Sequence, residues 1–160
     1  MQETPPLEAV EATYGQLDCE KEDLFMAERG MLLEAAKRMV EAAEKKAIEI
    51  NVPMVITVCD MGGNLVLLHR MEDSLLASLE IAQNKAYTAV ALKMPSAAVK
   101  DLAKEGEELQ GIAVGHAGKI VYFGGGFPIV KDGKQIGGIG VSGGSVAEDS
   151  CVAQAGLDAL

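Results

Sequence analysis

Residues 122–144, YFGGGFPIVKDGKQIGGIGVSGG, constrain the fold more than any other stretch of this sequence. Glycine is concentrated here, and the pair Asp132-Gly133 separates two segments rich in β-branched residues, 127–131 and 134–142. A two-residue type I′ turn needs positive φ at both central positions, which Asp and Gly tolerate. The pattern therefore predicts a β-hairpin, and with it a sheet that is antiparallel at this point.

The glycines of this stretch allow two interpretations. Gly138, Gly140 and Gly143 spell G-x-G-x-x-G, but the dinucleotide-binding fold also needs a later parallel strand and an acidic residue about 20 positions on. One predicted helix is all that follows them here. We therefore interpret residues 124–126 as the corner into a strand, and residues 137–140 as a place where a neighbouring backbone or helix approaches closely. Backbone N–H groups at residues 143–146 stay open as a site for a small anion.

Hydrophobic periodicity and turn residues predict the remaining elements. In order, they are a short helix within residues 4–17, a long helix over 24–50, strands over 54–59 and 65–71, a helix over 74–93, a short helix within 94–106, strands at about 109–115, 118–123, 127–131 and 134–142, and a helix over 145–160. Ser74 is the predicted N-cap of one helix. Ser145 with Glu148 forms a capping box for the last one. Ala117-Gly118 gives a second, weaker hairpin signal.

This order of elements predicts the fold class. Because hairpins dominate, we expect an α+β fold with an antiparallel sheet of five or six strands flanked by helices. The order in chain direction is helix, two strands, one or two helices, four strands and helix. We divide the chain into an N-terminal extension, residues 1–22, and one domain, residues 23–160.

Composition and charge exclude several classes of function. The formal net charge of −10 argues against a nucleic-acid-binding surface, which needs clustered Lys and Arg. The three cysteines lie far apart without a C-x-x-C motif, so neither a disulfide framework nor a zinc site is indicated. No window reaches the ~18 apolar residues of a membrane span, and the start lacks the pattern of a signal peptide. We expect a cytoplasmic protein without nucleic-acid or membrane partners.

Several motifs together resemble a known family. The sequence contains a D-x-G-G-N-L turn at 60–65, the step R-M-x-x-x-x-L-A-S at 70–78, N-K-A-x-T-A at 84–89, the corner G-G-G-x-P at 124–128 and G-x-I-G-V-S-G-G at 137–144. In this order they closely resemble the GlcG/HbpS-like family, which includes the C-terminal domain of PduO and is often labelled haem-degrading. The resemblance covers about residues 30–160.

The resemblance implies a profilin-like antiparallel sheet flanked by helices and assembly into homo-oligomers. It also implies binding of haem or a corrinoid, in the setting of glycolate, diol or glycerol utilisation. The family has no agreed catalytic mechanism, so no catalytic residue and no metal ligand set is assigned, and a non-catalytic role is favoured over an enzymatic one.

Residues 1–22 depart from the family's core pattern. A short amphipathic helix joined by a polar linker is similar to peptides that target enzymes into bacterial microcompartments. Residues 1–22 are therefore a candidate contact to a microcompartment shell or to enzyme cargo. The alternative, a helix that docks on its own oligomer or a frayed terminus, stays open.

The candidate ligand-binding residues are His69, His116, Lys85 and the three glycines Gly124, Gly125 and Gly126. His69 shares a strand face with apolar residues and could offer an imidazole to haem iron, or serve as a hydrogen-bonded structural histidine. His116 precedes a turn and is expected to be solvated. Lys85 could form a Schiff base or bind an anion, or could extend past apolar surface as an ordinary charge.

Some family members hold haem through a residue near the start of the first long helix. Tyr14, Cys19 and Met26 lie in that region of this sequence, which contains no histidine.

Three hypotheses for function follow. The first is an oligomeric accessory protein that binds haem, a corrinoid or a small organic ligand. The second is an enzyme acting on a small oxygenated metabolite, whose carboxylate or phosphate would be received by Lys85, Arg70 or the helix start near Ser145. The third is a purely structural or packaging protein.

Overall fold

The computed structural model describes residues 19–160, with side chains from Leu32 onward. Residues 19–31 belong to the first part of helix α2 (Cys19–Glu49), and residues 32–160 form a compact unit of their own. The long helix predicted over 24–50 is therefore confirmed, with a start five residues earlier. The helix predicted within residues 4–17 lies outside the described residues.

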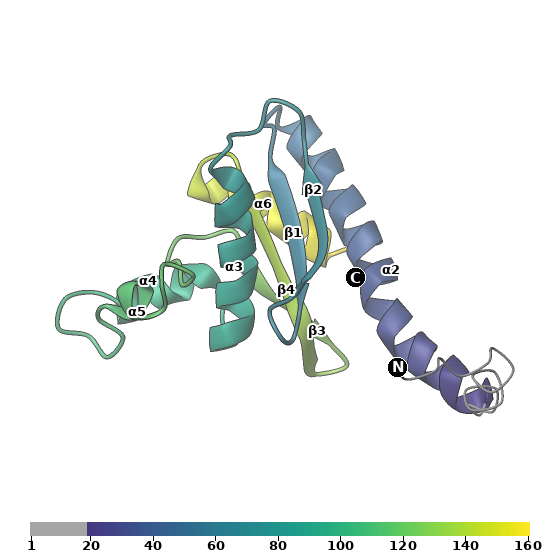
Figure 1. Ribbon diagram of the computed structural model, residues 1–160. Coiled ribbons are helices and arrows are strands. Elements are labelled where there is room, and N and C mark those ends of the chain that lie inside the picture. Colours follow the sequence, from purple (N-terminus) through teal and green to yellow (C-terminus); the bar gives the residue numbers. More distant parts are fainter. Residues whose placement is uncertain (1–18) are drawn as a thin grey trace, which may run out of the picture. The chain divides into compact units, whose positions relative to one another are not determined.

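One antiparallel sheet organises the unit (Figure 1). Within the described residues its four strands are β1 (Val55–Asp60), β2 (Leu65–Arg70), β3 (Gly126–Lys131) and β4 (Lys134–Ser142), arranged in the order β2-β1-β4-β3. The β3–β4 hairpin turns at Asp132 and Gly133, with φ of 49° and 74°. The predicted hairpin and the α+β class are confirmed.

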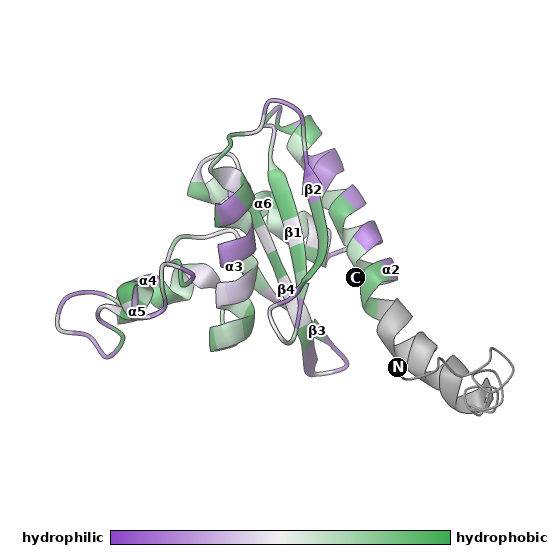
Figure 2. Cartoon of the chain, in the orientation of Figure 1, coloured by the Kyte–Doolittle hydropathy of each residue, from purple (hydrophilic) through white to green (hydrophobic). Residues whose placement is uncertain are grey.

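The first face of the sheet packs against α2 and α6 (Val146–Leu157). Buried side chains from both helices and from β1, β3 and β4 form one apolar cluster here. Its members include Met39 and Ala43 of α2, Ile56 of β1, Ile139 of β4 and Val152 of α6. In Figure 2, β1 is mostly apolar, whereas the coloured part of α2 alternates between apolar and hydrophilic residues. This is the pattern of a helix with one buried stripe.

The opposite face packs against α3 (Ser78–Leu92), and glycine makes this contact close. A Cβ at Gly138 would lie 2.6 Å from the carbonyl oxygen of Ala86, and a Cβ at Gly140 would collide with the backbone of Ala82 and Ala86. A side chain at either position would push the helix off the sheet. The predicted close approach of a helix to residues 137–140 is therefore confirmed, and the glycines of the G-x-G-x-x-G pattern act in packing.

The segment between α3 and β3 differs from the prediction. It contains η1 (Ser96–Ala98), α4 (Val99–Leu102) and α5 (Ile112–Gly115), so the short helix expected within 94–106 is present, but the strands expected at 109–115 and 118–123 are not. Local backbone bonds replace a strand ladder: Gly118 N donates to the carbonyl oxygen of Ala113 at 2.8 Å. The turn at Ala117 and Gly118 therefore closes α5 and joins no hairpin, and the expected five or six strands become four.

The start of α3 also differs from the prediction. The helix begins at Ser78, and the residue before it makes no side-chain cap bond. Ser74 Oγ instead donates to the carbonyl oxygen of Met71 at 2.8 Å, next to Asp73 with φ of 63°. Ser74 thus closes a turn after β2, because its hydroxyl bonds backward along the chain.

Candidate functional site

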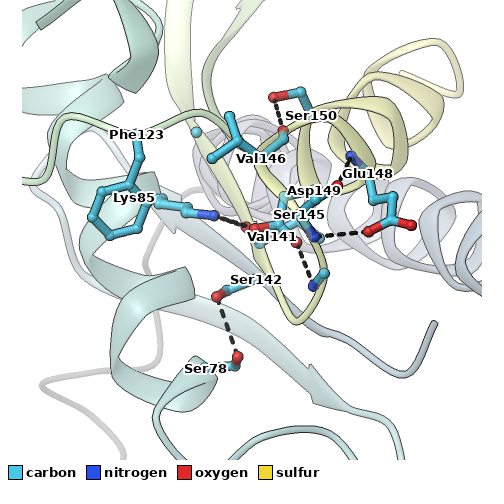
Figure 3. A network of polar contacts seen from close by, with 12 residues as sticks. Ser78, Lys85, Phe123, Val141, Ser142, Ser145, Val146, Glu148, Asp149 and Ser150 are labelled. Atoms are coloured by element: carbon cyan, nitrogen blue, oxygen red, sulfur yellow. Dashed lines mark hydrogen bonds and ion pairs between the residues drawn. The ribbon is translucent and has the colours of Figure 1, made fainter. Parts of the chain in front are cut away.

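A buried lysine and a buried aspartate form the centre of the polar network in Figure 3. Lys85 extends from the middle of α3, and Asp149 lies in the first turn of α6. Lys85 Nζ donates to Asp149 Oδ2 at 2.6 Å and to the carbonyl oxygen of Val141 at 2.7 Å. These two bonds join α3, β4 and α6 at one point.

The interior position changes the acid–base chemistry of the lysine. Burial lowers the pKa of the Lys85 ammonium below its usual value, because the charged form loses hydration, although the hydrogen bond and the charge of Asp149 act to raise it. A buried ion pair adds little stability compared with apolar side chains in the same space. Removing only one partner is destabilising, because it leaves a buried charge without compensation. The pair therefore makes the position of α6 depend on α3.

Residues 124–126 cover this ion pair. A Cβ at Gly125 would lie 2.9 Å from Lys85 Nζ and 2.6 Å from the carbonyl oxygen of Val141, so the lysine can be covered here only by bare backbone. The hydroxyl of Ser96 holds both ends of the glycine segment, since it donates to the carbonyl oxygen of Phe123 at 2.9 Å and accepts from Gly126 N at 3.0 Å. Protein atoms therefore fill the space beside these glycines.

The first turn of α6 completes the network. Ser145 and Glu148 form the predicted capping box, in which Glu148 Oε2 accepts from Ser145 N at 2.7 Å. Asp149 Oδ1 accepts from Gly144 N at 2.9 Å. Two of the backbone donors considered above for a small anion are thus bonded to carboxylates of the chain itself.

Three of the sequence motifs meet at this network. N-K-A-Y-T-A contains Lys85, G-G-G-F-P contains the glycines that cover it, and V-S-G-G is the segment that leads from β4 into α6, where Asp149 lies. Lys85 is fully buried, so in this conformation it binds Asp149 rather than a ligand. Arg70, the other cation of the enzyme hypothesis, lies exposed at the end of β2. The arrangement can position α6, and it offers no open surface to a substrate.

His69 lies apart from this network, on the sheet face that α2 covers. Its strand partner is Ile56, and its Nε2 lies 3.2 Å from Glu44 Oε1 of α2. Its side chain is 39% exposed. An apolar cavity of about 170 Å³ lies at the C-terminal end of α2 and just after β2, lined by Ala47, Ile48, Asn51, Val52, Pro53 and Met71. His69 and Glu44 are not among its lining residues.

His116 lies at the end of α5 and is exposed, as expected. Its Nε2 lies 2.9 Å from the hydroxyl of Tyr87, and the two rings are tilted at 33° with centroids 5.8 Å apart. Tyr87 also lines a second cavity, of about 320 Å³.

The structure therefore brings Lys85 together with Gly124, Gly125 and Gly126, while each histidine lies at a separate place. Their roles as ligand-binding residues stay predictions. Sequence reasoning missed Asp149, Ser96 and Tyr87. Asp149 stands beside the capping-box glutamate in the first turn of a helix, where a carboxylate is ordinary. Nothing in the sequence indicates its partner 64 residues away.

No helix between residues 19 and 160 is both long and apolar enough to cross a membrane. In the same part of the chain, no three His, Cys, Asp or Glu side chains are grouped to hold a metal ion.

Comparison with known proteins gives a consistent result. The family model described as haem-degrading protein HbpS-like matches residues 31–158. A 15.0 kDa protein of Citrobacter freundii, described by its place in the dhaT-dhaS intergenic region, is 46% identical over 126 residues, which cover 79% of this chain and 89% of that protein. Among solved structures, a complex of PduOC with haem has a TM-score of 0.78 and 38% identity, over 79% of this chain and 92% of that one.

A further relative is longer than this chain. The corrinoid adenosyltransferase PduO of Salmonella typhimurium is 40% identical over 123 residues, which cover 77% of this chain but only 37% of PduO. The similarity therefore concerns one part of that protein.

Proposed function

The chain belongs to the HbpS-like family, and on this premise we propose that it is an oligomeric accessory protein that binds haem, or a corrinoid of similar shape. The observation that carries the proposal is the similarity to PduOC, whose structure was solved as a haem complex. The corrinoid alternative is supported by the name of PduO alone. The two histidines, His69 and His116, both lie outside the start of the first long helix, so a histidine ligand to the iron would be one of these two.

We assign that ligand to His69. An iron-bound histidine commonly directs its other ring nitrogen to a carboxylate, which orients the ring and raises its basicity. Glu44 stands in this position, with its Oε1 atom 3.2 Å from His69 Nε2. An apolar cavity begins one helical turn after Glu44 and two residues after His69, with Ile48 and Met71 in its lining. An apolar wall suits the flat face of a macrocycle. These residues of the chain therefore fit the group.

The size of this cavity makes assembly a requirement of the proposal. At about 170 Å³ it is smaller than the ~300–1,000 Å³ of typical ligand pockets. It could cover only part of a tetrapyrrole, and a second subunit would cover the rest. Bound haem supplies an iron whose reactivity depends on its protein ligand and on the polarity around it.

Titration with haemin tests the proposal. We expect the wild-type protein to shift the Soret band with saturation at a defined stoichiometry, and His69→Ala to lose that shift. His116→Ala is the control, because it removes the other imidazole, which is exposed at a different place, and should bind haemin as the wild type does. Glu44→Gln should weaken binding about tenfold, as loss of such a partner typically does. Equal binding by wild type and His69→Ala would refute the assignment of His69, and no Soret shift in the wild type would refute haem binding.

We propose a metabolic setting of diol, glycerol or glycolate utilisation, in the cytoplasm and within a bacterial microcompartment. The place of the Citrobacter freundii relative between dhaT and dhaS supports a link to a metabolic gene cluster. Residues 1–22 would then provide contact to the shell or to enzyme cargo. Deletion of residues 1–22 should abolish encapsulation of the protein, measured in purified compartments, and unchanged loading would refute this role.

A further inference from the structure

The cavity beside Tyr87 has features that the haem proposal does not use. It measures about 320 Å³ and is formed by Met61, Gly62 and Gly63 of the β1–β2 turn and by Tyr87, Val90, Ala91 and Lys93 at the end of α3. Its volume falls at the lower end of the range typical of small-molecule pockets, ~300–1,000 Å³. The lining combines an aromatic ring, short apolar side chains and one cation, so this cavity suits a ligand with an apolar body and one polar end.

The walls of this cavity are held in place by the fold. A Cβ at Gly63, where φ is 74°, would lie 2.7 Å from the Tyr87 ring, so the turn can lie against the ring only because this residue is glycine. Lys93 ends α3 in the left-handed conformation, with φ of 53°, and its N–H donates to the carbonyl oxygen of Val90. The backbone of Lys93, and with it the Cβ of its side chain, is therefore held in place by the end of the helix.

Positive charge gathers around Tyr87 in a chain whose formal net charge is −10. Lys93 lines the cavity, and the ammonium of Lys119 lies 5.6 Å from the centroid of the Tyr87 ring. In the part of the chain that the structure describes, neither lysine forms an ion pair with a carboxylate. Lys93 thus belongs to the wall of the cavity, and Lys119, which is not a lining residue, contacts the Tyr87 ring from another segment.

Within the described residues, the carboxylate of the same turn forms no ion pair with either lysine. Asp60 Oδ1 accepts hydrogen bonds from Gly62 N at 2.8 Å and from Asn64 N at 2.9 Å, so it is bonded within the turn. The hydroxyl of Tyr87, bonded to His116, adds a neutral hydrogen-bonding group at the far end of the ring.

We propose that this cavity binds a small organic anion, with an apolar or aromatic body against Met61, Tyr87 and Val90 and a carboxylate or phosphate between Lys93 and Lys119. This site is separate from the one assigned to haem, because His69 lies on the sheet face covered by α2, whereas Tyr87 belongs to α3 on the opposite face. Binding here and haem binding can therefore succeed or fail independently.

Three probes separate the contributions of body and charge. Benzoate has an aromatic ring and a negative charge. Benzyl alcohol has the ring without the charge, and inorganic phosphate has the charge without the ring. We expect benzoate to shift the amide signals of Gly62, Gly63 and Ala91 in ¹H–¹⁵N NMR spectra with saturation. The other two probes should bind at least about fivefold more weakly. Equal affinity for benzyl alcohol would overturn the anion part of the proposal, and no saturable shift with benzoate would overturn the site.

Variants test the residues. Lys93→Met and Lys119→Met should each weaken benzoate binding about two- to fivefold, the range for a solvent-exposed ion pair. Tyr87→Ala should abolish binding. Lys45→Met is the matched control, since it removes the same charge from α2 on the other face of the sheet and should leave the affinity unchanged. If Lys45→Met weakens binding as much as the cavity variants do, the effect is one of net charge and the site is wrong.

Discussion

On the sheet face that α2 and α6 cover, Met39, Ile56 and Ile139 fill the space between layers with large apolar side chains. On the face that α3 covers, Gly138 and Gly140 bring the helix backbone against the strands, and a buried ion pair links the middle of α3 to α6. The first face is stabilised by apolar area removed from water, which tolerates moderate changes of shape. The second depends on close backbone contact and on satisfied polar groups, so small changes there should have larger effects.

The largest effect is expected where one charge is left without its partner. Asp149→Ala would leave the Lys85 ammonium buried and unpaired, and the free energy of unfolding should fall by about 3–5 kcal/mol. Urea denaturation measures this loss. The double variant Lys85→Met with Asp149→Leu should recover most of it, because no buried charge remains. A double variant as unstable as Asp149→Ala would mean that the pair is not the main link between α3 and α6.

A single methyl group tests the close contact of α3. Gly140→Ala would place a Cβ against the backbone of Ala82 and Ala86, and overpacking of this kind should lower the free energy of unfolding by about 1–3 kcal/mol. Gly115→Ala is the control, because no atom lies within 4 Å of a Cβ built there. Its change should stay within about 0.5 kcal/mol. Similar losses for both variants in thermal or urea unfolding would contradict the packing role of Gly140.

The smallest effect should have the opposite sign. Thr57 faces α3 from β1 and is buried, and within the described residues its hydroxyl has no hydrogen-bond partner. Thr57→Val keeps the shape and removes the unsatisfied hydroxyl, so the free energy of unfolding should rise by about 1 kcal/mol. Thr57→Ser keeps the hydroxyl and loses a methyl group, so its free energy of unfolding should fall by about 0.8 kcal/mol. If Thr57→Val is destabilising, the hydroxyl has a partner, such as a buried water.

The sequence predicted features that depend on neighbouring residues. The turn at Asp132 and Gly133, the capping box of Ser145 and Glu148 and the amphipathic stripe of α2 involve residues a few positions apart. The wrong strands at 109–115 and 118–123 arose because short apolar runs between glycines fit a strand as well as a helical turn. Backbone bonds within the segment, such as that from Gly118 to Ala113, decided against a sheet there.

The candidate sites were predicted only in part. The sequence indicated Lys85 and His69, but it could not tell a free lysine from a paired one or identify the carboxylate beside His69. Lys85 meets Asp149, 64 residues further along, only because α3 packs on the glycines of β4 and α6 begins at the end of that strand. Glu44 meets His69 only because α2 lies along β2.

The sequence by itself therefore determined the long helices, the two hairpins of the sheet and the family, because these depend on spacing, turn chemistry and motif order. Only the tertiary structure decided which polar side chains are enclosed and which face solvent. The reason is that burial and pairing depend on segments from distant parts of the chain, whose approach is governed by how the layers pack.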